Sequence, residues 1–229
     1  MTRQPFISIS IRRLAISLLL LLTASTTQAQ LKFFTMEKDS IPLFRGFSVS
    51  FDLAGAAMMA LSDYGQYEGA LRLNLHDEWF PIVELGLGKA DYNDVTTQLY
   101  YKTSAPYFRV GIDRNLLKNK HGKNRLYGGL RYAHTSYKVD IIRPPFSDPH
   151  WGWMAGYELK DVQCYYHWLE AVVGIDAQVF GPLHLGWSVR YKLRVAHSKH
   201  DFGKTWYVPG FGTDDDTKLG VSFNVIIDI

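Results

Sequence analysis

The feature that most constrains this chain is a strict two-residue alternation that recurs in eight separate segments. The last of them, LGVSFNVIIDI at residues 219–229, places an apolar side chain at every odd position from Leu219 to Ile229. Because successive side chains of a strand point to opposite faces, the pattern predicts a strand with one apolar and one mixed face. The other seven segments are centred on apolar sets that begin at Phe47, Tyr67, Val83, Phe108, Leu126, Leu169 and Leu183.

The connections between these segments alternate in length. HDEW, NKHGKN and FGPL are short, whereas DYNDVTTQLYYKTSAP, DIIRPPFSDPHWGWMAGYELKD and AHSKHDFGKTWYVPGFGTDDDT are long; LSDYGQ is a short exception on the long-loop side. An even number of strands of about nine to thirteen residues, with short turns at one end, is typical of a transmembrane barrel. We therefore predict an all-β fold, an eight-stranded antiparallel up-and-down transmembrane β-barrel over residues 44–229. The sequence also allows short additional strands within residues 94–104 and 135–142, which would extend existing strands above the membrane.

A soluble sandwich or lipocalin-like barrel also alternates, with its apolar face turned inward. Its second face would then be solvated, but here that face combines small residues with balanced charges, which suits a narrow, filled lumen. We expect the inward charges to form a stabilising ion-pair network rather than a transport path, so a general porin is not expected. The predicted network contains Asp52, Glu68, Arg72, Glu84, Arg109, Asp113, Arg131, Glu170, Asp176, Arg190, Lys192 and Arg194.

The first 29 residues have the organisation of a secretory signal peptide. Arg3, Arg12 and Arg13 precede the apolar run LAISLLLLLTAS, and small residues precede Gln30. Residues 30–43 are then a periplasmic segment, and we expect an integral outer-membrane protein with both termini in the periplasm. Removing three of the 25 basic residues leaves 22, equal to the 22 acidic ones, which argues against a nucleic-acid partner. The single cysteine, Cys164, allows no internal disulfide.

Aromatic residues gather in two of the long connections. Trp151 and Trp153 lie among prolines, and Trp206, Tyr207 and Phe211 lie in the last loop. Exposed aromatic side chains rimmed by polar residues often mark a protein contact, and loops are where a barrel of this size carries function. We predict partner binding by these five residues. The alternative is that the loops pack on one another over the mouth of the barrel.

Two candidates for chemistry are weaker. His134 and Ser136 lie at the end of the fifth segment, and this H-x-S pattern resembles the site of lipid A deacylases. Glu158 is named as the third, acidic residue of such a site without a motif that supports it. A polar strand end at the membrane interface explains the same residues. His197, His200 and Asp201 share a loop with the acidic run 214–216, but no spacing motif supports a metal. We expect no cofactor, no metal and no enzymatic activity.

The block LSDYGQYEGALRLNLHDEWFPIVELGLGKADY, residues 61–92, resembles a largely uncharacterised family of small outer-membrane barrels from Bacteroidota-type Gram-negative bacteria, with the eight-stranded architecture of OmpA and OmpX. The resemblance implies an accessory subunit of an outer-membrane complex, for instance the barrel-assembly machinery, that contacts outer-membrane lipids and protein partners through its aromatic loops or outer wall. The alternatives are a lipid A-modifying hydrolase that uses His134 and Ser136, and a narrow channel or surface adhesin.

Overall fold

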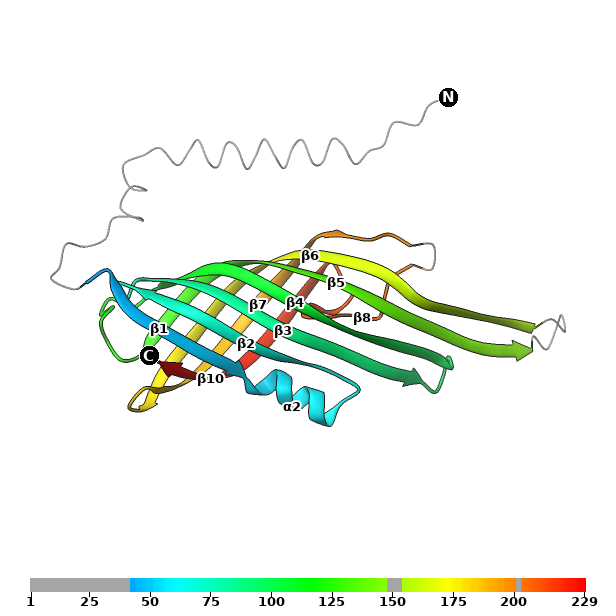
Figure 1. Cartoon of the computed structure of the whole chain (residues 1–229), viewed down its shortest axis with the longest axis horizontal. Helices are drawn as coiled ribbons and strands as arrows, with labels where there is room; N and C mark the ends of the chain where they lie inside the picture. The colour runs from blue at the N-terminus through cyan, green and yellow to red at the C-terminus, as the bar shows by residue number, and fades with distance from the viewer. Residues whose placement is uncertain (1–41, 148–153, 201–202) are drawn as a thin grey trace, which may run out of the picture. The chain divides into compact units, whose positions relative to one another are not determined.

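The computed structural model describes residues 42–147, 154–200 and 203–229. Its elements are β1 (Phe44–Asp52), α2 (Leu53–Leu61), β2 (Tyr64–Leu75), β3 (Trp79–Asp94), β4 (Leu99–Asn115), β5 (Arg125–Ser147), β6 (Met154–Phe180), β7 (Leu183–His197), β8 (Tyr207–Val208), β9 (Gly212–Thr213) and β10 (Thr217–Asp228). The eight long strands close into a barrel in the order β1–β10–β7–β6–β5–β4–β3–β2 (Figure 1). The predicted eight-stranded up-and-down barrel is confirmed.

The two end strands close the ring. Phe47 and Ile229 exchange both main-chain hydrogen bonds, at 3.1 and 2.7 Å between nitrogen and oxygen. Pairing continues from Ser48–Asp228 to Asp52–Asn224. In lipid every backbone polar group needs an internal partner, and ring closure supplies one for strands that would otherwise be edges. Ile229, directly after the end of β10, therefore has both of its main-chain groups paired with Phe47.

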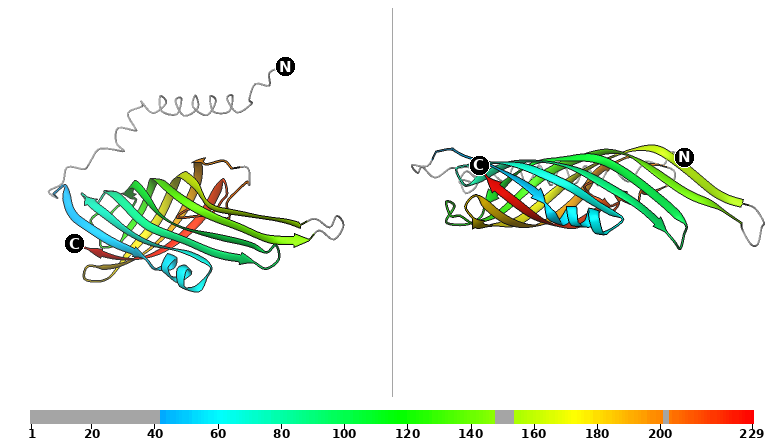
Figure 2. Two further views of the ribbon diagram at one scale, coloured as in Figure 1. Left: turned by 45° about the vertical axis from the view of Figure 1, so that its right-hand side comes forward. Right: turned by 60° about the horizontal axis from the view of Figure 1, so that its bottom comes forward.

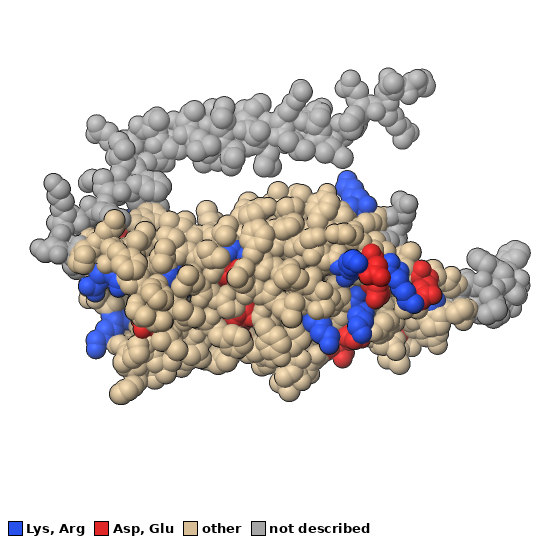
Figure 3. Space-filling model, viewed as in Figure 1, with Lys and Arg blue, Asp and Glu red and all other residues tan. Residues whose placement is uncertain are grey.

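The two faces of the wall have opposite chemistry. Outward side chains such as Leu85, Leu130 and Val221 are 64%, 69% and 65% exposed. Inward side chains such as Glu84 and Arg109 are buried. On the face seen in Figure 3, Lys, Arg, Asp and Glu gather near the ends of the barrel and leave a mostly uncharged band between them. The predicted orientation of the alternating faces is correct.

Two predicted long connections are mostly strand. β3 and β4 pair up to Asp94–Leu99, so that only a four-residue turn, 95–98, separates them. β5 and β6 contain 23 and 27 residues and continue as a two-stranded ribbon beyond the rest of the wall (Figure 2). Of the segments left open as extra pairing, 135–142 lies wholly in β5, and 94–104 lies in β3 and β4 except for the turn 95–98. The loop assignment was wrong because the alternation changes sense in these extensions: in β5, Tyr137, Val139 and Ile141 are buried and Lys138 is exposed, so the apolar side chains point inward instead of toward lipid.

Helix α2 was also not predicted. The first strand ends at Asp52, whose carboxylate caps the helix by accepting a hydrogen bond from Ala54 N at 3.1 Å. The segment LAGAAMMAL that follows is dominated by strong helix formers. Leu53 therefore begins a helix instead of continuing the strand. Among the described residues, no helix is long and apolar enough to cross a membrane.

Several predictions fall outside the described residues. These are the signal peptide, most of the segment 30–43, the two tryptophans of the β5–β6 connection and Asp201.

Candidate functional site: the lumen and its mouth

Charged side chains from five strands meet in the centre of the lumen. Arg109 Nε lies 2.8 Å from Glu170 Oε1, and its Nη1 contacts Glu68 and lies 3.1 Å from Glu84 Oε2. Arg190 Nη1 lies 3.1 Å from Glu68 Oε1 and 2.9 Å from Glu84 Oε2. All five side chains are at most 5% exposed. The two arginines therefore share three carboxylates, and these ion pairs connect β2, β3, β4, β6 and β7.

A second group of charges continues the cluster toward the short-turn end. Arg131 contacts Glu84 and lies 3.0 Å from Asp113. Arg72 lies 2.5 Å from Asp176 and 3.6 Å from Asp113, and its guanidinium stacks 4.6 Å above the ring of Tyr127. Each carboxylate of this group is buried. Because burial of an unpaired charge is so costly, the alternating signs explain how so many charges can share one lumen.

Three residues of the predicted network lie at its edges. Lys192 Nζ donates to the main-chain oxygens of Gly210 and Phe211 at 2.7 and 3.1 Å. Asp52 accepts hydrogen bonds from main-chain nitrogens at the start of α2 and in β10. Arg194 lies 3.2 Å from Asp214 and also contacts Asp216. The other nine predicted residues form the two groups described above.

A third group of charges, which the sequence analysis missed, lies at the short-turn end. Its carboxylates are Asp77, Glu78 and Asp228, which pair at 2.6–3.3 Å with Arg45 and His121, with Arg114 and Lys120, and with Arg125 and His184. Burial alone would raise the pKa of Asp77, but hydrogen bonds from His121 and Asn74 hold that pKa below its ordinary value. The pKa of Glu78 is lowered against burial by Lys120 and Arg114. In the sequence, the charged residues of the short turn HDEW could have indicated this third group.

The last long connection folds into the mouth of the barrel. Its short hairpin, β8 and β9, carries Tyr207, Val208 and Phe211, each at most 3% exposed. Tyr101 Oη donates to Tyr207 O at 2.6 Å. Arg109 Nη2 donates to Gly210 O at 2.8 Å, which joins the hairpin to the ion-pair cluster beneath it. The hairpin therefore acts as a plug; we call it the mouth plug, residues 207–213.

The predicted exposure of the loop aromatics is wrong for two residues. Tyr207 and Phe211 are buried, because they fill the barrel mouth. Trp206 is half-buried and stacks on Tyr92 with ring centroids 4.5 Å apart. For these three residues the structure matches the alternative interpretation, packing over the mouth. Partner binding by Trp151 and Trp153 stays a prediction.

His134 and Ser136 are adjacent on the outer face of β5 but are not joined. The His134 ring lies 4.3 Å from the ring of His167, whose Nδ1 is 2.6 Å from Tyr132 Oη. Ser136 Oγ accepts a hydrogen bond from Gln163 at 3.4 Å, and Glu158 pairs with Lys160. The arrangement therefore lacks the contact between nucleophile and base that acyl transfer needs.

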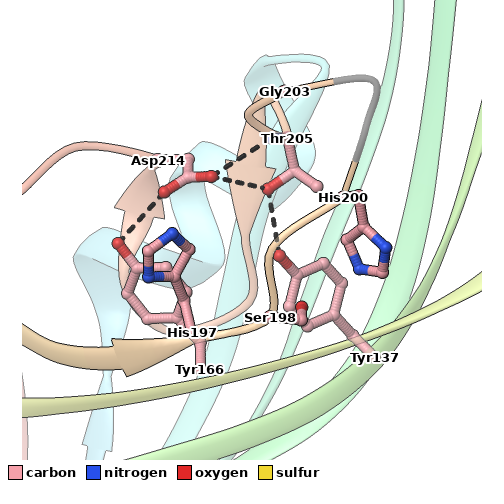
Figure 4. Close-up of a pocket in the computed structure, with 8 residues that line it drawn as sticks. All are labelled: Tyr137, Tyr166, His197, Ser198, His200, Gly203, Thr205 and Asp214. Atoms are coloured by element: carbon pink, nitrogen blue, oxygen red, sulfur yellow. Dashed lines mark hydrogen bonds between the residues drawn. The ribbon is translucent and has the colours of Figure 1, made fainter. Parts of the chain in front are cut away.

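The histidines of the last loop border a small cavity beside the mouth plug (Figure 4). Its volume is about 10 Å³, which is room for one water molecule. Asp214 accepts hydrogen bonds from Thr205 N, Thr205 Oγ1 and Tyr166 Oη, so both of its carboxylate oxygens already have protein partners. Within the described ranges, no three His, Cys, Asp or Glu residues are grouped to hold a metal ion.

Taken together, an apolar outside and a charged, plugged inside define a membrane-spanning barrel of the outer-membrane type. The outward side chains of the wall, which contact lipid, are apolar. The lumen is crossed by ion pairs and its mouth is covered by the mouth plug. Such a barrel offers its outer wall and its protruding strands for interaction.

Comparison with known proteins gives structural and family matches. The structure of Ail, the attachment invasion locus protein of Yersinia pestis, is 12% identical with a TM-score of 0.39, covering 80% of this chain and 93% of Ail. Ail in complex with the heparin analogue sucrose octasulfate gives 12% and 0.37 over the same shares. A major outer membrane protein from Thermus thermophilus gives 13% and 0.42, covering 80% of this chain and 98% of that one.

No curated protein matches the chain. The family described as "Domain of unknown function (DUF6048)" matches residues 9–228, which is nearly the whole sequence. The chain therefore belongs to the DUF6048 family.

Proposed function

We propose that this protein is a non-enzymatic, non-conducting barrel of the outer membrane that serves as an accessory subunit of an outer-membrane protein complex. The observation that carries the proposal is the ribbon formed by the distal parts of β5 and β6 (Figure 1). We infer that this ribbon is extracellular, because the short turns of such barrels are periplasmic and the ribbon extends from the opposite end of the wall.

The ribbon has an open edge. The β6–β7 register begins at Tyr166–His197, and Ser198 extends it by one step through its bond to Tyr165 O. Before Tyr165, the described residues of β6 pair with β5 alone. On the other side, the register between β4 and β5 stops at Tyr100–Ile142. Strands paired on one side present main-chain donors and acceptors that can recruit a strand from a partner.

Charges on the ribbon favour a specific partner over self-association. Lys160 pairs with Glu158, and Lys138 lies 3.1 Å from Asp161. These side chains are all more than half exposed. Charged side chains on an open edge discourage indiscriminate edge-to-edge pairing, so a partner must match them. In the sequence, Trp151 and Trp153 lie between β5 and β6.

The barrel-assembly machinery is the first complex to test, as the family resemblance implies. The tagged full chain is purified from native outer membrane in a mild detergent, and co-purifying proteins are quantified by mass spectrometry. We expect a stoichiometric outer-membrane partner. A monomer without partners, reproduced across several mild detergents, would contradict the proposal.

A matched pair of variants at one position tests the open edge. Tyr165 directs its main-chain groups toward Ser198, so Gln163, two residues away, directs its N–H to the same side. Gln163→Pro removes that donor, whereas Gln163→Ala keeps it and removes the same side chain. We expect partner loss with proline only, while both variants keep the heat-dependent gel mobility of a folded barrel. Equal partner recovery from both would show that the edge is not the binding element.

A further inference from the structure

The barrel wall has a seam where β1 ends early. β10 pairs with β7 over eleven residues, Thr217–Leu193 to Ile227–Leu183, but with β1 over only five. β1 stops at Asp52, opposite Asn224, so the part of β10 from Thr217 to Phe223 is paired on one side only. On the other flank, β2 pairs with β1 only as far as Gly69.

Helix α2 occupies the place of the missing half-strand. It packs so closely on β2 that a Cβ at Gly65 would lie 2.3 Å from Met59 N. Asp52 connects the start of the helix to β10, because its Oδ1 accepts from Ala54 N and from Phe223 N at 3.1 and 3.3 Å. Figures 1 and 2 show α2 beside β10 at this point of the wall. The helix thus closes tightly against β2 and leaves space along β10.

That space is a cavity of about 280 Å³ that runs from the outer wall to the mouth plug. Its outer rim includes Met58, Leu219 and Val221, which are 43%, 67% and 65% exposed. Its inner end includes Tyr207 and Phe211 of the mouth plug, which are buried. The volume is nearly twice the roughly 150 Å³ of a dry protein cavity that accepts benzene.

The seam faces lipid. Helix α2, LAGAAMMAL, has no charged residue, and Leu53, Met58 and Leu61 are exposed. Unpaired strand backbone at membrane depth is tolerated only where it lines a protein-walled cavity, as it does here. An occupant that enters from the side must therefore be apolar along most of its length.

The inner end of the cavity is cationic. Lys192 and Lys218 line it, and Asp52 is the one carboxylate among the lining residues. Lys192 Nζ donates to two main-chain oxygens and Lys218 Nζ to Thr213 Oγ1, so each ammonium keeps at least one hydrogen for a ligand. The combination of an apolar rim with two lysines fits an acyl chain carrying a nearby negative charge.

We propose that the seam between α2 and β10 is a lateral binding site for one acyl chain of an anionic lipid from the surrounding membrane leaflet. The chain would lie between Met58 and Val221, with the negatively charged headgroup region near the two lysines. In the ring order β5 stands opposite β1, so the site lies across the barrel from His134 and Ser136. The proposal is independent of the accessory-subunit function.

The test is photocrosslinking of the full chain reconstituted in phosphatidylethanolamine vesicles that contain phosphatidylglycerol with a diazirine in one acyl chain. Adducts are mapped by peptide mass spectrometry. We expect labelling of α2 and of residues 219–221, together with labelling of Tyr207 or Phe211. The last result is decisive, because lipid that merely surrounds the barrel cannot reach the mouth plug. Labelling confined to outward side chains all around the wall would overturn the proposal.

A matched pair of glycine variants blocks the site. A side chain at Gly220 would enter the cavity and meet first the flexible end of Lys192, at 3.2 Å, so Gly220→Leu should fold and fill the space. Gly69→Leu adds the same side chain to the exposed wall, where the nearest atom is 3.7 Å away. We expect loss of plug labelling only with Gly220→Leu. Plug labelling that persists in that folded variant would overturn the proposal.

A charge variant tests the lipid class without filling the cavity. Lys218→Gln should reduce plug labelling by the phosphatidylglycerol probe several-fold and leave a phosphatidylcholine probe with the same chain unaffected. Competition by added palmitate would instead identify a free fatty acid as the occupant and overturn the assignment to a membrane lipid. If Gly220→Leu does not fold, the Lys218→Gln comparison and the wild-type adduct map still decide the question.

Discussion

Replacing Glu84 with alanine removes a carboxylate that three buried arginines share. Arg109 and Arg190 lie 3.1 and 2.9 Å from its Oε2, and Arg131 contacts its Oε1. Removing one partner of a buried ion pair typically costs about 3–5 kcal/mol. Each arginine keeps another carboxylate, so we expect the lower end, about 3 kcal/mol. That corresponds to roughly a hundredfold change in the unfolding equilibrium constant.

The assay is a urea titration of the barrel refolded in lipid vesicles, in which folded and unfolded protein are separated by gel mobility without boiling. Lys199→Ala, at an exposed loop position, is the control and should leave the midpoint unchanged. Arg131→Met combined with Glu84→Ala should destabilise less than the sum of the single variants, because both break the same pair. A Glu84→Ala midpoint equal to that of Lys199→Ala would refute the view that the lumen charges hold the strands together.

Three further predictions concern the mouth plug, the turn end and the outer histidine. Gly210 has φ +81°, and a Cβ there would lie 2.6 Å from the Tyr107 ring, so Gly210→Val should dislodge the mouth plug and raise the low single-barrel conductance expected of the wild type in planar bilayers. The lowered pKa of Asp77 means that its contribution is complete above the unfolded value and is lost as pH falls below about 4. Asp77→Asn should therefore flatten the loss of stability in acid-titrated unfolding. Ser136→Ala should leave lipid A acylation in cells identical to wild type, and a changed acylation pattern would revive the hydrolase alternative.

The barrel itself was readable from the sequence because its membrane imposes a simple rule. Every strand must show lipid an apolar face, so residues such as Leu85 and Val221 repeat with period two, and inward residues such as Glu84 and Arg109 follow by parity. The membership of the lumen cluster could be predicted for the same reason. Which arginine would meet which carboxylate could not, because the pairs join residues as far apart as Glu84 and Arg190.

The connections were harder to predict, since no bilayer enforces a pattern on them. The ribbon of β5 and β6 continues by main-chain pairing, and in β5 the apolar side chains Tyr137, Val139 and Ile141 point inward, opposite to the apolar side chains that face lipid lower in the same strand. Tyr207 and Phe211 have the composition of a binding loop, yet they are buried because the barrel mouth provides a cavity of matching size. Only the closed ring creates that cavity.

The sequence by itself determined the class of fold, the number of strands and which side chains face lipid or lumen, because these depend on the local period of two. The tertiary structure alone decided the register that pairs the charges and the inward folding of the mouth plug. Those features depend on which residues the closure of the ring brings together, and contacts between strands distant in the sequence leave no local signal.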